Sequence, residues 1–166
     1  MPDLLALLPP LLAPLIGHWY IAIKKLLPQD NSAVGTEYKL LRPDLIMTFN
    51  EAKTYLLSKP GAVESYPFYV DLMVPKVGGK MFATLSFRNG SAQMNLKCDP
   101  DEALALRDIF RAVIPGYHMN KKHWNTVILD GSIPQNEIKR MIDNSYQLVI
   151  KNLSSKIRTN LSLPYD

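Results

Sequence analysis

One segment in the second half of the chain, Pro115–Ser132, concentrates polar, basic and aromatic side chains where a turn enters an apolar run (PGYHMNKKHWNTVILDGS). Lysine ammonium groups can neutralise phosphates, and asparagine amides can both donate to and accept from bases or sugars. The rings of tyrosine, histidine and tryptophan offer planar surfaces on which a base can stack. The segment is therefore a candidate binding surface, and its candidate residues are His118, Asn120, Lys121, Lys122, His123, Trp124 and Asn125, with Tyr117 as a further ring.

The same segment also has a purely structural interpretation. Trp124 can belong to the core, and His123 can cap a backbone carbonyl. Asn120 can simply stabilise the turn, because asparagine side chains bond readily to nearby backbone groups. The residue types alone leave both interpretations open.

Further basic residues lie beside two glycine-containing turns. The segment KVGGK sets Lys76 and Lys80 around a glycine pair, whose tip could approach a phosphate closely. It is not a Walker loop, because the spacing is wrong and a strand follows instead of a helix. Arg88 begins the second turn, Arg88-Asn89-Gly90, and Lys97 adds a cation to the next strand. The alternative is a pair of ordinary hairpins with solvated lysines.

Catalytic and metal chemistry find little support in the remaining residues. Cys98 is the only cysteine and falls on the apolar side of a predicted strand, where a free cysteine is usually a small buried hydrophobe. His118 and His123 could act as bases towards it, but nothing in the spacing requires contact. Lysines separate these two histidines, and their positive charge opposes cation binding. We expect no catalytic residue, no cofactor, no metal site and no enzymatic activity.

The elements that must position these residues follow from periodicity and from turn signals. We expect helices at Thr48–Ser58, Asp99–Val113 and Pro134–Leu153, and strands at Tyr69–Val77, Met81–Phe87, Ala92–Cys98 and His123–Leu129. Thr48 and Glu51 form a capping box, and Asp99 precedes a proline at a helix start. The order α-β-β-β-α-β-α predicts an α+β two-layer sandwich, with the helices on one face of an antiparallel sheet.

Alternation along the central strands predicts which side chains are buried. The apolar set is Met81, Ala83, Leu85, Phe87, Met94, Leu96 and Cys98. The opposite set is Lys80, Phe82, Thr84, Ser86, Arg88, Gln93, Asn95 and Lys97. We therefore expect a polar sheet face with basic residues and one exposed aromatic ring, Phe82.

Composition and charge set broad limits. The chain has 166 residues, 47% hydrophobic residues and a net charge of +4, which fits one globular domain and is compatible with a polyanionic partner. The charge excess falls entirely after residue 46. A single cysteine excludes an intramolecular disulfide and fits a reducing cytosol, so we expect a cytoplasmic protein.

The first 46 residues differ from the rest in composition. Leu4–Ile23 is almost uncharged and long enough to span a bilayer, but Pro9, Pro10 and Pro14 interrupt any helix there. The alternatives are a dispensable or misassigned extension, an accessory helix packed on the domain, and membrane insertion. We expect a soluble protein with a proline-rich extension at 1–46, a domain at 47–158 and a tail at 159–166.

Three segments together carry a resemblance to a known family: KVGGKMFATLSF, MNLKCDPDEA and PGYHMNKKHWNTVILDGS. In this order they closely resemble the MmcQ/YjbR family of small bacterial proteins, over about Met47 to Ile157. The resemblance implies a frataxin-like (CyaY-like) fold and DNA binding through a double-wing arrangement. Iron handling, which the frataxin fold suggests, is not expected, because the helix acids Glu51, Asp101, Glu102 and Asp108 are too sparse for an acidic ridge.

The leading functional hypothesis is a DNA-binding protein without catalysis, in which the basic hairpin wings and the Tyr117–Asn125 loop contact DNA. The alternative is a small-ligand or protein-binding domain that uses the polar sheet face and the region of His118, His123 and Trp124. A concave cavity beside these three residues would favour the alternative, whereas a flat and uniformly basic surface would favour DNA.

Overall fold

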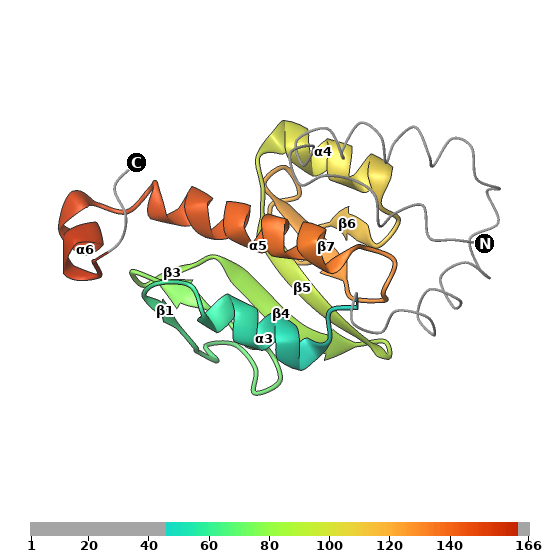
Figure 1. Cartoon of the computed structure of the whole chain (residues 1–166), viewed down its shortest axis with the longest axis horizontal. Coiled ribbons are helices and arrows are strands. Elements are labelled where there is room, and N and C mark those ends of the chain that lie inside the picture. The colour runs from blue at the N-terminus through green and yellow to red at the C-terminus, as the bar shows by residue number, and fades with distance from the viewer. Residues whose placement is uncertain (1–45, 163–166) are drawn as a thin grey trace, which may run out of the picture. The chain divides into compact units, whose positions relative to one another are not determined.

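A computed structural model of the chain describes residues 46–162. The expectations for the apolar segment Leu4–Ile23 fall outside the described residues. The described part is an α+β structure whose strand pairs are antiparallel, which confirms the predicted α+β class with antiparallel sheets (Figure 1). Its elements are α3 (Phe49–Leu57), β1 (Ala62–Val63), β2 (Lys76–Val77), β3 (Lys80–Met81), β4 (Ala83–Arg88), β5 (Ser91–Lys97), α4 (Pro100–Ile109), β6 (Val113–Pro115), β7 (Trp124–Ile128), α5 (Gln135–Ile150) and α6 (Ser155–Asn160).

The main sheet has four strands in the order β4-β5-β7-β6. β4 and β5 form a hairpin in which Asn89 and Gly90 have φ angles of 51° and 78°. Positive φ at both turn positions is what the Asn-Gly pair predicts for a tight hairpin. β7 joins the other edge of β5, with Trp124 opposite Lys97. The strands predicted at Met81–Phe87, Ala92–Cys98 and His123–Leu129 are thus confirmed in their main parts.

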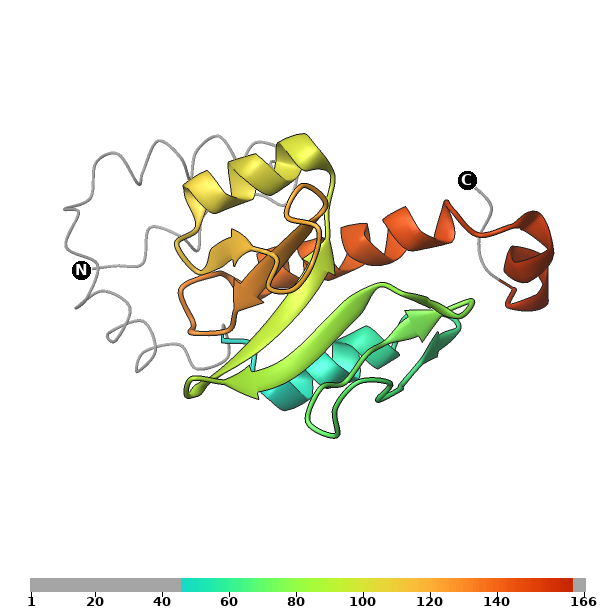
Figure 2. The same cartoon turned by 180° about the vertical axis from the view of Figure 1, so that it is seen from behind.

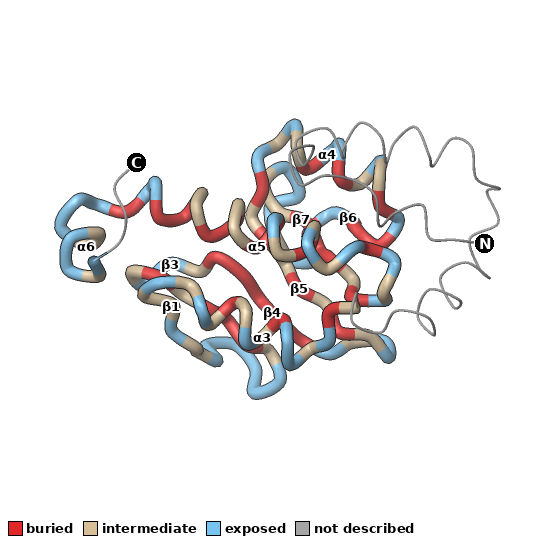
Figure 3. The backbone as a smooth tube through the Cα atoms, viewed as in Figure 1, coloured by how far each residue is buried: buried red, intermediate tan, exposed pale blue. Residues whose placement is uncertain are grey.

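The predicted strand Tyr69–Val77 is wrong for most of its length. Only Lys76–Val77 is a regular strand, in a small second sheet of order β1-β2-β3, and Met73 adds an isolated bridge to β4. Pro75 lacks the N–H that a continuous ladder needs. The residues before Met73 form an exposed loop (Figure 3), in which Val70 is 93% exposed.

Side-chain caps fix where two helices begin. The Thr48 hydroxyl accepts from Glu51 N at 3.3 Å, and the Glu51 carboxylate accepts from Thr48 N at 2.8 Å, so the predicted capping box is confirmed. The Asp99 carboxylate caps α4 by accepting from Asp101 N at 3.0 Å. Among the helices of residues 46–162, none has the length and apolar character needed to cross a bilayer.

The predicted helix Asp99–Val113 is too long at its C-terminal end, and the edge strand that follows was not predicted. α4 ends at Ile109, and Phe110 is already extended, with φ −117° and ψ 117°. β6 then pairs with β7 at the edge of the main sheet, where Pro115 is tolerated because an edge strand has no partner on its outer side. Phe110 and Val113 are buried, so their apolar character was consistent with a longer helix as well.

Helices α3 and α5 cover one face of the main sheet (Figures 1 and 2). The buried side of α5 consists of Ile138, Met141, Ile142, Ser145, Tyr146, Val149 and Ile150. Within it, the Ser145 hydroxyl donates to Phe82 O at 2.5 Å and accepts from Lys97 N at 2.8 Å. One buried hydroxyl therefore ties α5 to the start of β4 and to the end of β5.

Two phenylalanines have the opposite exposure from that predicted. Phe82 is 0% exposed and meets Tyr146 of α5 edge-on, with ring centroids 5.5 Å apart, whereas Phe87 is 61% exposed. The ladder is interrupted at Phe82, between β3 and β4, and an interruption resets which side chains face inward. Phe87 lies on the core side of β4 but next to the hairpin turn, where little packs over it. The rest of the predicted apolar set is buried, except for the half-buried Met81.

Candidate functional site

The loop between β6 and β7 folds onto the outer, polar face of the main sheet. Gly116 N donates to Trp124 O at 2.9 Å, and Tyr117 N donates to Thr126 Oγ1 at 2.9 Å. A Cβ at Gly116 would lie 2.8 Å from the Trp124 Cβ, so only glycine permits this close approach. His118 follows with φ 55°, and its ring lies 4.0 Å from the Tyr117 ring, centroid to centroid. The loop thus presents two adjacent rings over the sheet.

Hydrogen bonds between side chains hold the polar face together beneath this loop. Thr126 Oγ1 donates to Asn95 Oδ1 at 2.6 Å, and Asn95 Nδ2 donates to Thr84 Oγ1 at 3.0 Å. These bonds cross from β7 through β5 to β4, and Gln93 Nε2 donates to Arg88 O at 3.3 Å. Each residue belongs to the polar face, which is therefore an ordered, hydrogen-bonded surface.

This polar face is the floor of a pocket of about 360 Å³, which lies within the usual range of about 300–1,000 Å³ for small-molecule sites. The floor residues include Thr84, Ser86, Gln93, Asn95 and Thr126, and the walls are Phe68, Tyr69 and Leu72 from one loop and Tyr117, His118 and Met119 from the other. Phe68, Tyr69 and Tyr117 are 62%, 65% and 52% exposed. Large exposed rings gathered around a polar floor are typical of a binding site.

The charge at this pocket is positive. The Arg88 guanidinium carbon lies 5.1 Å from the centroid of the Tyr117 ring, and none of the described residues that line the pocket is aspartate or glutamate. Within residues 46–162, no three His, Cys, Asp or Glu side chains come together as a metal-ligand group. Arginine is well suited to pair with a carboxylate or phosphate. The pocket therefore matches a ligand that carries both a planar ring and an anionic group.

Two of the predicted binding residues, Arg88 and His118, line this pocket. Three others, Asn120, Lys121 and Lys122, are exposed on the loop that follows His118. The Asn120 side chain accepts from Lys122 N at 3.0 Å, which is the turn-stabilising role considered as an alternative. The basic part of the loop thus lies next in sequence to the pocket wall.

Lys97, His123 and Trp124 lie where β5 ends and β7 begins. Lys97 and Trp124 are opposite each other in the ladder, and Lys97 Nζ is 5.9 Å from the centroid of the Trp124 ring. His123 is half-buried, and its backbone N donates to Asn120 O at 3.0 Å. His123 and Trp124 are not among the residues that line the pocket.

Asn125 is buried on the far side of the sheet from the pocket, which contradicts its predicted role as a residue that contacts nucleic acid. It is 2% exposed and lies opposite Leu96 on the helix-covered side of the sheet. Its Oδ1 accepts from Arg107 Nε at 2.7 Å, and its Nδ2 donates to Ala103 O at 3.3 Å. Arg107 of α4 also donates to Lys121 O. Its bonds to Asn125 and to Lys121 therefore anchor the end of the β6–β7 loop to α4.

The hairpin that carries Lys76 and Lys80 lies at the opposite end of β4 from the Asn-Gly turn (Figure 1). One of its two tip glycines is packed, because a Cβ at Gly78 would lie 2.8 Å from Ile157 Cγ2 in α6, whereas a Cβ at Gly79 would meet nothing within 4 Å. Lys80 Nζ donates to Asn152 O at 3.0 Å. The two predicted wing tips therefore lie at opposite ends of β4. At the first tip Gly78 lies against the C-terminal helical segment, whereas Gly79 and Lys80 are exposed.

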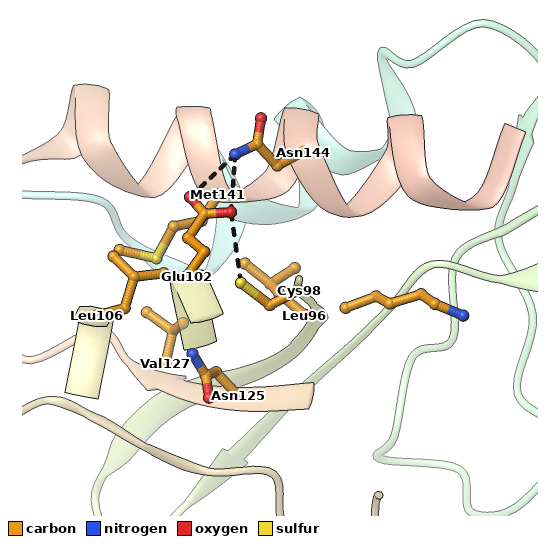
Figure 4. A pocket seen from close by; sticks show the side chains of 9 residues that line it. Leu96, Cys98, Glu102, Leu106, Asn125, Val127, Met141 and Asn144 are labelled. Atoms are coloured by element: carbon orange, nitrogen blue, oxygen red, sulfur yellow. Dashed lines mark hydrogen bonds between the residues drawn. The ribbon is translucent and has the colours of Figure 1, made fainter. Parts of the chain in front are cut away.

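Cys98 lies on the helix-covered side, beside a void of about 10 Å³, which has room for about one water. Its thiol donates to Glu102 Oε2 at 3.6 Å, and Asn144 Nδ2 donates to Glu102 Oε1 at 3.1 Å (Figure 4). Burial, followed by the charge of Glu102, raises the pKa of the Cys98 thiol to about 12. The thiol stays protonated near neutral pH, so Cys98 is a poor nucleophile.

One wall of the pocket was not predicted from the sequence. Phe68 and Tyr69 belong to the run YPFYV at 66–70, which was assigned in part to a strand. Large apolar residues in succession, with a proline among them and no alternation, fit a half-buried strand poorly. That run was a usable indication of an exposed aromatic loop.

Comparison with known proteins finds similar sequences in bacteria. The sequence model of the YjbR family matches residues 57–148. The chain is 36% identical over 112 residues to the uncharacterised protein YjbR of Escherichia coli (strain K12), covering 68% of this chain and 95% of that protein. It is also 36% identical over 105 residues to the uncharacterised protein YbdF of Escherichia coli O157:H7, covering 63% and 86%.

Two solved structures share the fold. The crystal structure of the Deinococcus radiodurans protein DR2400 has a TM-score of 0.67 and 33% sequence identity, covering 72% of this chain and 91% of that chain. The crystal structure of a Pseudomonas syringae protein has a TM-score of 0.56 and 28% identity, covering 61% and 98%. Both alignments extend over most of the partner chain, so the likeness concerns a whole domain.

Proposed function

The chain belongs to the YjbR family, and we propose that it is a non-catalytic binding protein whose site is the pocket on the polar face of the main sheet. Its ligand carries a planar ring and an anionic group. We place this role in the cytoplasm, within a frataxin-like arrangement of the elements.

One observation carries this proposal: exposed rings from two loops surround a hydrogen-bonded polar floor of about 360 Å³ in volume. Phe68 and Tyr69 on one side, and Tyr117 and His118 on the other, offer faces for a ring. Arg88 is the permanent cation among the lining residues, and no carboxylate of the described lining opposes an anion. The floor consists of hydroxyl and amide side chains, which give the ligand hydrogen-bonding partners.

Three simple probes separate the contributions of ring and charge. Phenyl phosphate has both, benzyl alcohol has only the ring, and inorganic phosphate has only the anion. Titration of the full chain, followed by calorimetry, should give tighter binding for phenyl phosphate than for either of the other two. Equal binding of all three, or no binding of phenyl phosphate, would overturn the proposal.

A matched pair of variants locates the binding. Tyr117→Ala removes a pocket ring that is 52% exposed. Phe87→Ala removes a ring of similar exposure, 61%, that does not line the pocket. Phenyl phosphate affinity should fall in Tyr117→Ala and stay unchanged in Phe87→Ala. An equal loss in both variants would mean that the effect is not local to the pocket.

Duplex DNA is a second candidate ligand, favoured by the exposed pair Lys121 and Lys122 next to the pocket wall. The backbone of Lys121 is held by Arg107, so the pair projects from an anchored loop. Duplex binding should weaken with salt, because neutralising phosphates releases counterions. Replacing both lysines by alanine should weaken all duplex sequences alike and reduce the salt slope by about one unit for each lost contact. Unchanged affinity in this double variant would remove the duplex candidate.

A further inference from the structure

The polar floor offers more hydrogen-bonding positions than a simple aromatic anion can use. A side-chain amide has two donors and one acceptor oxygen with two lone pairs. In Gln93 the described bonds use one donor, and in Asn95 they use one donor and one lone pair. Both amides line the pocket. Amides of this kind can bond to the edges of nucleobases, which present donors and acceptors in the ring plane.

Cations lie at both ends of this floor. Arg88 is opposite Ser91 at the start of β5, and Lys97 is the last residue of the same strand. Gln93, Asn95 and Lys97 alternate along one side of β5, so Lys97 shares the polar face with the pocket. At about 3.4 Å per residue, the two cations are separated by about 20 Å along the strand. A ligand with repeated anionic groups could therefore contact both cations.

The rings over the floor favour an unpaired base. Phe68, Tyr69 and Tyr117 are each more than half exposed and line the pocket from two separate loops. A base in a duplex is already stacked and paired, so it would have to leave the helix before it could enter the pocket, at a cost of about a few kcal/mol. A base in a single strand meets no such cost. Stacking on aromatic rings beside a basic track is how many proteins hold single strands.

We infer that the polar face binds single-stranded nucleic acid, with one unpaired base in the pocket against Tyr117 and phosphates near Arg88 and Lys97. This inference rests on the proposed function of the pocket and names the ligand class. Duplex DNA then contacts at most the rim of the site.

The test compares a short fluorescein-labelled oligothymidylate with its duplex with oligoadenylate, by anisotropy on the full chain. The single strand should bind more tightly than the duplex of the same length. Its affinity should fall with salt, with a slope of about 0.7 for each phosphate contact. Tyr117→Ala should weaken the single-strand complex by about five- to 150-fold, the range for loss of one stacked base.

Matched variants guard against an effect of misfolding. Tyr117→Phe keeps the ring and should retain single-strand binding, and Phe87→Ala should leave it unchanged. Arg88→Gln should weaken binding and reduce the salt slope. Thermal unfolding midpoints should be similar among these variants, since the replaced side chains are at least partly exposed.

The outcomes separate this inference from the proposed function. Phenyl phosphate binding without oligothymidylate binding would leave the pocket as a small-ligand site and overturn the inference. Duplex binding that equals or exceeds single-strand binding would also overturn it and support the duplex candidate. If phenyl phosphate and both nucleic acids fail to bind, the inference and the proposed function fall together.

Discussion

The two faces of the main sheet use polar side chains in different ways. On the helix-covered face, Ser145 and Asn125 bond to groups of the protein itself, and the void beside Cys98 has room for only about one water. On the open face, Thr84 and Asn95 are also bonded, but exposed rings and a pocket of about 360 Å³ lie above them. Substitutions on the covered face should therefore change stability, and substitutions on the open face should change binding.

The largest expected difference in the free energy of unfolding is between alanine variants of two phenylalanines, Phe82 and Phe87. Phe82→Ala should reduce the free energy of unfolding by about 3–5 kcal/mol, because it leaves a cavity against Tyr146. Phe87→Ala should change it by about 0.5 kcal/mol or less, because that side chain is 61% exposed. Urea unfolding of both variants measures the difference. Strand alternation alone predicts the reverse order, so a larger loss in Phe87→Ala would contradict the observed packing.

A smaller effect is expected from the hydroxyl that joins α5 to the sheet. Ser145→Ala leaves Lys97 N without its acceptor and Phe82 O without its donor, which should reduce the free energy of unfolding by about 1–3 kcal/mol. Ser132→Ala is an exposed control and should be neutral. Chemical denaturation gives both values, and calorimetry with phenyl phosphate should show unchanged affinity at temperatures where Ser145→Ala is folded. A loss of affinity without a loss of stability would contradict the separation of the two faces.

At neutral pH the smallest effect on stability is that of ionising the Cys98 thiol, because the thiol is then protonated in both the folded and the unfolded state. Burial raises its pKa from 9.0 to about 12, so folding favours the protonated form. This contribution to stability is complete below pH 9 and is lost as the pH rises towards about 12. The free energy of unfolding of the wild type should therefore fall relative to that of Cys98→Ala across this window. Tyr146, whose pKa is also raised by burial, is present in both proteins and cancels in the difference.

The same thiol can be followed by chemical modification. At neutral pH the native protein should react slowly with a thiol reagent, and the protein unfolded in urea should react quickly. Rapid modification of the native protein would show that Cys98 is accessible and ionised, which would return it to the set of candidate nucleophiles.

The helix starts, the β4–β5 turn and the burial pattern of β5 could be predicted from the sequence, because they depend on residues close together in the chain. The Thr48–Glu51 capping box, the Asp99 cap and the Asn89-Gly90 turn each depend on side chains within a few residues. The buried and polar sides of β5 followed from alternation, since Ser91–Lys97 is a continuous strand. Alternation also places Asn125 on the covered side of β7, so its burial could have been predicted as well.

The pocket could not be predicted in the same way, because its parts meet only in three dimensions. Phe82 N still donates to Pro75 O at 3.2 Å, but Pro75 has no N–H to return the bond, so the ladder ends there. The sequence alone did not locate this break, so the Phe82 ring was assigned to the wrong side of the sheet. Tyr117 comes over the sheet because Thr126 accepts its backbone N–H. Tyr117 lines the same pocket as Phe68 and Tyr69, although the two loops are distant in sequence. Spacing within either loop gives no sign of the other.

The central claim is that the polar face of the main sheet is the binding site, and chemical-shift mapping with phenyl phosphate tests it most directly. Titration of the ¹⁵N-labelled full chain should shift the side-chain amides of Gln93 and Asn95 and the backbone amides of Tyr117 and His118. Signals from the Lys76–Lys80 hairpin and from Asn144 on the covered face should stay in place. Shifts confined to that hairpin or to the covered face, or no shifts at all, would contradict the claim.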